Sequence, residues 1–238
     1  MFLAPALAAC RPSDAPRTRE SHRGPAIVAR AVEAHGGLAR WRELRTLSAR
    51  YRERWFWPWT WAGVTPWPGN EISATLRFAL HTDVAHAVFD RWPGQRWRYA
   101  GGSVASEGEG IDADEWKPWF ALPRTHFLTL LPFKFADATA QLQWLGRRDG
   151  LDEVLVTYPP GAGQTPEDRY WARFDPETGR LVSVALTVTA YGPLAAGDLR
   201  YENWQWVDGL LLPGRIPAVL TGPQLPLHTG EYSGISVE

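Results

Sequence analysis

The chain has 238 residues, enough for one β-rich domain or two small ones with a sizeable core. Its formal net charge is −1, so it lacks the basic field with which proteins attract nucleic acid, and a nucleic-acid-binding function is excluded. The unusual feature of the composition is its 14 tryptophans. Such side chains fill a core, line a cavity or lie near a membrane interface.

The N-terminus predicts the cellular location of the protein. The single cysteine, Cys10, follows Leu7-Ala8-Ala9 and a short apolar run, which is typical of the end of a secretory signal. This Leu-Ala-Ala-Cys resembles the lipobox of bacterial lipoproteins, which implies lipidation of Cys10 and anchoring on the periplasmic side of the cell envelope. Arg11 rather than Asp follows the cysteine, and by the same resemblance this favours the outer membrane. The alternative is an apolar segment with a chance cysteine.

The polar, proline-containing residues 11–23 predict a flexible tether after the anchor, so residues 1–23 are interpreted as signal remnant and tether. No later stretch approaches the roughly 18 apolar residues of a membrane span. The first helix is expected over residues 24–34, where Ile27, Val28 and Ala31 begin an apolar stripe. His35-Gly36-Gly37 is a typical helix end.

A strand with alternating faces is predicted from Leu47 onward. Arginines 50, 52 and 54 take the outer face, while the opposite parity holds Tyr51, Glu53, Trp55 and Trp57. The aromatic segment that follows contains three prolines and two glycines and is expected to be a loop. We predict that its tryptophans contact a membrane or cargo, the alternative being that the loop folds back on the mouth of the sheet. These tryptophans are Trp57, Trp59, Trp61 and Trp67.

The remaining chain predicts further strands around a helical insertion. A hairpin is expected over residues 168–191, because Asp175-Pro-Glu-Thr-Gly179 is a turn between two runs rich in aromatic and β-branched residues. Residues 101–110 are expected to be a loop, and residues 112–121 and 125–131 to be helical. The other predicted strands cover residues 72–81, 84–91, 95–99, 141–147, 153–158, 199–207, 214–220 and 229–237.

Several short motifs in this order resemble the LolA/LolB-like superfamily. They are Ala34-His-Gly-Gly-Leu-Ala-Arg-Trp41, the Leu-Pro-Phe of the helical insertion, Phe174-Asp-Pro-Glu-Thr-Gly179 and Val207-Asp-Gly-Leu-Leu-Leu-Pro213. The resemblance implies an α+β, mainly β, fold over residues 24–238. In this fold a single curved antiparallel sheet forms an unclosed β-barrel around the helices and encloses an apolar cavity for acyl chains. LolA and LolB themselves carry lipoproteins across the periplasm, and the many tryptophans set this chain apart from them.

No catalytic or cofactor motif is present: the sequence lacks Gly-x-Ser-x-Gly, a phosphate-binding glycine loop, Gly-x-Gly-x-x-Gly and His-Glu-x-x-His. We therefore expect no enzyme activity, cofactor or metal. Glu53 is the carboxylate out of place, because its parity points inward and a buried carboxylate needs a partner. That partner is either an arginine across the sheet or the polar head group of a ligand.

The sequence thus predicts a lipid or other amphiphile as ligand, with other envelope proteins as further candidate partners. The alternative is a structural or protein-interaction lipoprotein whose core is filled. Strand parity and helix faces give the predicted ligand-binding residues, which are Tyr51, Glu53, Trp55, Leu76, Phe78, Leu80, Trp97, Tyr99, Phe127, Leu131, Val184 and Leu186.

Overall fold

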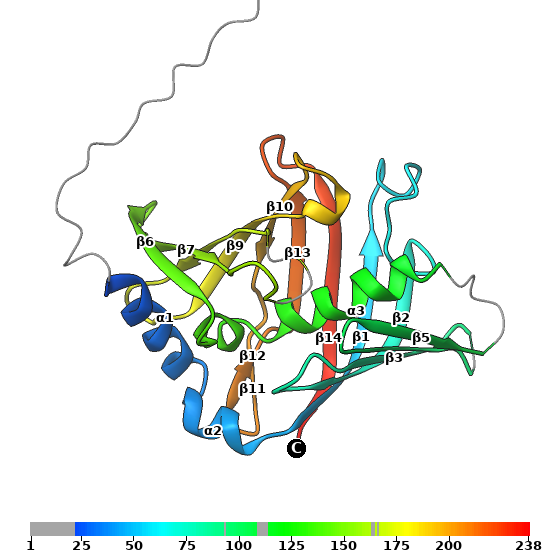
Figure 1. Cartoon of the computed structure of the whole chain (residues 1–238), viewed down its shortest axis with the longest axis horizontal. Coiled ribbons are helices and arrows are strands. Elements are labelled where there is room, and N and C mark those ends of the chain that lie inside the picture. Colours follow the sequence, from blue (N-terminus) through cyan, green and yellow to red (C-terminus); the bar gives the residue numbers. More distant parts are fainter. Residues whose placement is uncertain (1–21, 93, 109–113, 163–164, 166) are drawn as a thin grey trace, which may run out of the picture.

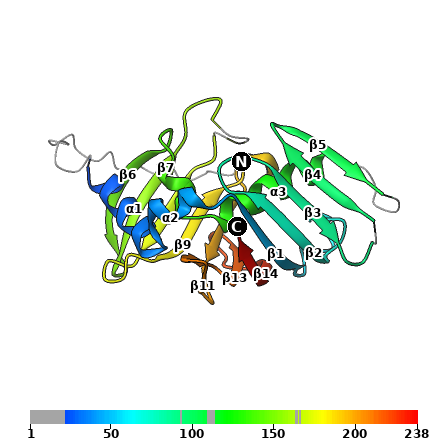
Figure 2. The same ribbon diagram turned by 90° about the horizontal axis from the view of Figure 1, so that it is seen from below.

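The computed structural model describes residues 22–238 except 93, 109–113, 163–164 and 166. Cys10 and residues 1–21 of the predicted anchor and tether lie outside the described residues. One antiparallel sheet of 12 strands dominates the chain, in the order β5-β4-β3-β2-β1-β14-β13-β10-β9-β8-β7-β6. The sheet curves around a central helix without closing, as Figures 1 and 2 show. The predicted fold class is confirmed.

The strands of the large sheet follow the predicted order closely. They are β1 (Thr46–Trp55), β2 (Glu71–Ala79), β3 (Ala85–Phe89), β4 (Arg96–Ala100), β5 (Ser103–Glu107), β6 (Gln141–Arg148), β7 (Leu151–Thr157), β8 (Tyr170–Phe174), β9 (Leu181–Thr187), β10 (Ala196–Arg200), β13 (Arg215–Leu220) and β14 (Pro226–Val237). A separate two-stranded sheet pairs β11 (Gln205–Val207) with β12 (Leu210–Leu212).

Strand β1 lies near the middle of the sheet, between β2 and β14. Its buried and exposed residues alternate as predicted, with Tyr51, Glu53 and Trp55 on the concave face and arginines on the convex face. This alternation fixes the register, because a slip of one residue would exchange the two faces. The concave face of β1 therefore contributes the central residues of the protein interior.

The helix α1 (Arg23–Ala34) packs against β6 and β7 at one side of the sheet. It ends at His35, whose Nδ1 donates to the carbonyl oxygen of Ala31 at 2.7 Å. Gly36 follows with a φ of 116°, and a Cβ there would lie 2.2 Å from the carbonyl oxygen of Gly209. Only glycine fits this close approach, which seats the short helix α2 (Gly37–Glu43) beside the β11–β12 turn.

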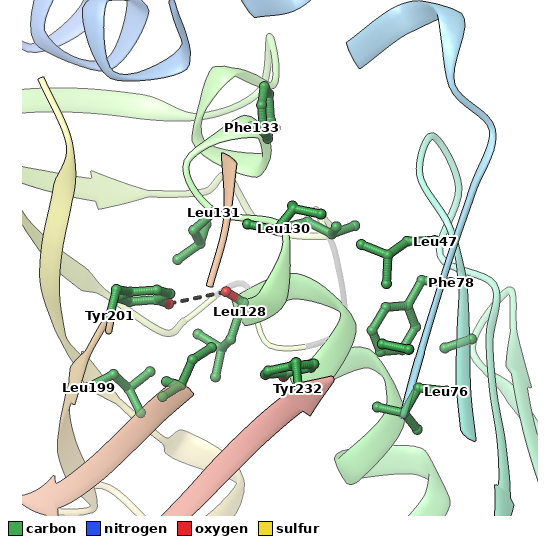
Figure 3. Close-up of a cluster of buried hydrophobic side chains, with 14 of the residues drawn as sticks. Leu47, Leu76, Phe78, Leu128, Leu130, Leu131, Phe133, Leu199, Tyr201 and Tyr232 are labelled. Atoms are coloured by element: carbon green, nitrogen blue, oxygen red, sulfur yellow. Dashed lines mark hydrogen bonds between the residues drawn. The ribbon is translucent and has the colours of Figure 1, made fainter. Parts of the chain in front are cut away.

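The central helix α3 (Trp116–Thr129) lies in the concave space of the sheet (Figure 1). It packs against β3, β4 and β5 and continues through Leu130 and Leu131 into the 3-10 turn η1 (Phe133–Ala136). Figure 3 shows Leu128, Leu130 and Leu131 between core side chains that come from strands on opposite flanks of α3. The hydroxyl of Tyr201 donates to the carbonyl oxygen of Leu128 at 3.2 Å, which fixes the end of α3 to the sheet.

The prediction was wrong in detail at three places in the chain. Residues 103–107 form strand β5 rather than part of a loop, because they pair with β4 across the Gly101-Gly102 turn. The two predicted helical segments are one helix, α3, which continues through Pro123. The strand expected over residues 199–207 is divided between β10 and β11, with Asn203 at a φ of 54° between them.

Candidate functional site

A cavity of about 920 Å³ lies between α3 and the sheet. Its walls are the α3 residues Trp119 to Leu128, the inward residues of β9, β10 and β13, and part of the loop after β1. The cavity also reaches η1 and the turn between β2 and β3. The lining is mainly aromatic and aliphatic. This volume lies within the range of about 300–1,000 Å³ that is typical of small-molecule sites.

Most of the strand residues that line the cavity come from β8, β9, β10, β13 and β14, because α3 packs directly against β3, β4 and β5; Tyr99 of β4 lies at its other end. Of the predicted ligand-binding residues, Trp55, Tyr99, Phe127 and Leu186 line it. A second group lies in the packed core with at most 1% exposure and does not line the cavity. This group comprises Leu76, Phe78, Leu80, Trp97, Leu131 and Val184. The strand residues of this group point inward as their parity predicted, and Leu131 points inward from the segment after α3, but the space that all six face is filled by side chains.

The aromatic loop after β1 has two kinds of tryptophan. Trp57 and Trp61 are 80% and 87% exposed, so their indoles stand in solvent, as the predicted membrane or cargo contact requires. Trp59 lines the cavity, and its Nε1 donates to the carbonyl oxygen of Pro226, at the start of β14, at 2.8 Å. Trp67 does not fit the predicted surface contact, because it is fully buried and stacks on Trp97 at a centroid distance of 5.8 Å.

Glu53 is fully buried beside the cavity and has a partner for each carboxylate oxygen. The indole Nε1 atoms of Trp55 and Trp67 donate to it at 2.7 and 2.8 Å, and the hydroxyl of Tyr51 donates as well. The Nη2 of Arg124, on α3, lies 3.1 Å from Oε2 and 3.2 Å from Oε1. The predicted arginine partner therefore exists, but it comes from the helix and not from across the sheet.

These contacts determine the charge state of the cluster. Burial alone raises the pKa of Glu53, but the charge of Arg124 and the hydrogen bonds from Tyr51 and Trp67 outweigh it and lower the pKa to about 2. Burial lowers the pKa of His228 to about 4, so its ring is neutral at pH 7. Its Nε2 lies 3.2 Å from Nη1 of Arg124, which assigns Nε2 as the acceptor and places the proton on Nδ1, 3.4 Å from Glu53.

The cluster of Glu53, Arg124 and His228 is thus an ion pair with a neutral imidazole, and it ties α3 to β1 and β14. Arg124 and His228 also line the cavity, so the cluster forms one of its polar walls. Sequence reasoning missed both residues. Arg124 follows Pro123, where a helix break was expected, and His228 stands at the start of β14, ahead of the predicted strand. The inward parity of Glu53 was the signal that a cationic partner had to exist.

The described residues show no metal-like cluster of three or more His, Cys, Asp or Glu side chains. His81 and His86, which bracket the β2–β3 turn, have separate partners. The Nε2 of His81 lies 2.7 Å from the carbonyl oxygen of Leu44, while His86 faces Arg77 and Arg98 on the neighbouring strands. Within the described part of the chain, no helix has the length and apolar character that a membrane span needs.

Comparison with known proteins relates this chain to others by structure rather than by sequence. No protein-family model matches it, and no curated protein matches it. A LolA superfamily protein from Nitrosomonas europaea superposes with a TM-score of 0.55 over 90% of this chain and 93% of its own, at 12% identity. The fold is LolA-like. A putative outer membrane lipoprotein-sorting protein domain from Vibrio parahaemolyticus gives a TM-score of 0.54 at 10% identity, covering 92% and 93% of the two chains.

The LolA-like fold explains why the site is an interior cavity. An unclosed sheet around a helix leaves space wherever the helix does not touch the sheet, and here that space faces β9, β10 and β13. The sequence resemblance noted above is confirmed at the level of fold. An identity of 10–12% carries the architecture and no residue-by-residue equivalence.

Proposed function

We propose that this protein binds a lipid or another amphiphile in the cavity between α3 and the sheet, as a non-catalytic carrier, chaperone or sensor of the cell envelope. The observation that carries the proposal is the cavity itself, with about 920 Å³ of space and a mainly apolar lining. An acyl chain that enters the cavity displaces water from this apolar surface, and the displacement favours binding. The LolA-like fold is consistent with this use.

Filling the cavity should abolish binding without unfolding the protein. Ala218 lies on β13 and lines the cavity, so Ala218→Phe should place its ring in open space. A fluorescent acyl probe that binds the wild type should then fail to bind, while the thermal midpoint changes little. The matched control is Ala87→Phe on β3, which is fully buried outside the cavity and should cost about 1–3 kcal/mol through overpacking.

The same experiment separates the proposal from its alternative, a structural or protein-interaction lipoprotein with a filled core. The cavity is not a ligand site if the wild type does not bind the probe and if Ala218→Phe destabilises the fold as much as Ala87→Phe does. Native mass spectrometry of the protein purified from membranes gives an independent answer, because a bound lipid should copurify with the wild type and not with Ala218→Phe.

We propose further that the protein is anchored through lipidated Cys10 on the periplasmic side, at the outer membrane. The Leu-Ala-Ala-Cys sequence supports this anchor. In the native host, Cys10→Ser should move the protein from the membrane fraction to the soluble fraction. An equal distribution of the two forms would contradict the anchor.

The exposed indoles of Trp57 and Trp61 are proposed to add a second, weaker membrane contact beside the cavity. Tryptophan suits a lipid boundary because it joins an apolar ring to a polar N–H group. In the soluble Cys10→Ser protein, replacing both with serine should reduce sedimentation with liposomes at unchanged thermal stability. Trp206, which is 60% exposed on β11, provides the control substitution.

A further inference from the structure

Among the residues that the structure describes, Lys134 is a cation that lines the cavity and forms no ion pair. It lies on η1, lines the cavity and is mostly buried. Its Nζ donates to the carbonyl oxygen of Leu80 at 3.2 Å, and among the described residues it forms no ion pair. An ammonium group has three N–H donors, so two remain for another acceptor. Arg124 differs, because Glu53 neutralises its charge within the wall.

The two carboxylates whose charges act on Lys134, those of Asp83 and Asp137, form no ion pair with it and have hydrogen-bond partners of their own. An oxygen of Asp83 accepts from the backbone N–H of Gly101 at 3.0 Å, and one of Asp137 accepts from the backbone N–H and hydroxyl of Thr139 at 2.8 and 2.6 Å. Both side chains are exposed at the edge of the cavity, where water screens them. A buried cation in an apolar cavity favours an anionic ligand that can reach its free N–H groups.

We propose that Lys134 is the head-group site of this cavity and that its ligand is an amphiphile with an acyl chain and a free carboxylate, such as a fatty acid. The inference rests on the proposed function and adds the chemical class of the ligand. The carboxylate accepts from the Lys134 ammonium beside η1. The acyl chain extends past Phe127 and Leu186 toward the wall formed by Ala218.

Several other titratable groups lie around Lys134. Burial lowers the pKa of Lys134 to about 8. His126, on α3, is neutral there because burial and the nearby Lys134 charge lower its pKa to about 3. Burial raises the pKa of Tyr158, on the β7 side, and hydrogen bonds from Thr139 lower that of Asp137. Asp83 and His81, on the β2–β3 turn, also line the cavity on this side.

The test compares parinaric acid with its methyl ester, two fluorescent probes that share one chain and differ in charge. The wild type at pH 7 should bind the acid at least about tenfold more tightly, the value expected for a hydrogen bond to a charged group. Lys134→Met should reduce the affinity for the acid to about that for the ester, and Lys134→Arg should keep the preference. Asp137→Asn removes a neighbouring negative charge, so its acid affinity should equal or exceed that of the wild type.

A pH series on the wild type gives a readout that does not depend on any variant folding. The preference for acid over ester should decline as the pH rises from 7 toward 10, because Lys134 loses its proton. Equal binding of acid and ester by the wild type overturns the head-group site and leaves the lipid-binding function standing, as does a preference that survives in Lys134→Met. Failure of the wild type to bind either probe overturns the proposed function and this site with it.

Discussion

Replacing Arg124 with methionine should lower the free energy of unfolding by about 3–5 kcal/mol. The substitution keeps most of the apolar volume of the side chain but leaves the fully buried carboxylate of Glu53 without its cation. The hydrogen bonds from Tyr51, Trp55 and Trp67 remain, and they cannot supply the missing charge. Urea unfolding followed by tryptophan fluorescence measures the change.

Two controls show whether the lost charge is the cause. Adding Glu53→Gln to Arg124→Met removes the stranded charge and should restore part of the stability. Arg52→Met breaks an ion pair with Glu71 whose side chains are 58% and 48% exposed, and should cost no more than about 1 kcal/mol. A similar loss for Arg124→Met and Arg52→Met would contradict the structural role assigned to the buried pair.

The second large effect is a loss of stability in mild acid. Burial lowers the pKa of His35 and His228 to about 4 and that of His126 to about 3, against an ordinary value of 6.5. The unfolded chain therefore takes up protons near pH 6.5 that the folded chain refuses until about pH 3–4. The stability is complete above pH 6.5 and is lost as the pH falls toward 4.

Three protons taken up on unfolding correspond to a slope of about 4 kcal/mol per pH unit near pH 5. We expect the urea midpoint to fall steeply between pH 7 and pH 5. His126→Leu removes one of the three groups and should make the decline shallower by about a third. A midpoint that does not change over this interval would show that these imidazoles are accessible to water in the folded protein.

The sequence predicted the sheet better than it predicted the cavity, and the reason is physical. Alternation along β1 requires only that one face be dry, so Tyr51, Glu53 and Trp55 were assigned inward correctly. Parity does not say what the dry face touches. Phe78 packs on His126 of α3 and Trp97 packs on Trp67 and Phe89, while Leu186 faces the cavity. This difference depends on where α3 lies within the sheet.

The position of α3 could not be derived locally. Pro123 argues for a helix end, because it lacks an N–H donor and disfavours the helical conformation of the residue before it. Tertiary packing overrides this preference, since α3 is held in the sheet by Arg124 and by the bonds at its C-terminal end. The burial of Trp67 could not be predicted for a similar reason, because Glu53, which accepts from its indole, lies 14 residues earlier in the chain.

The attachments of α3 also determine which wall of the cavity is rigid. Its middle is joined to Glu53 by a buried ion pair, and its C-terminal turn is joined to the sheet by Tyr201 and by Tyr232, whose hydroxyl lies 2.7 Å from that of Thr129. Lifting the helix would bring a charged pair and several polar groups out of contact together. The end of the loop after β1 is anchored by the buried Trp67, but its middle is held across the mouth by single hydrogen bonds from Trp59 to Pro226 and from Tyr191 to Val64. The cavity therefore has one firmly attached wall, formed by α3, and a more weakly attached rim, formed by the loop after β1.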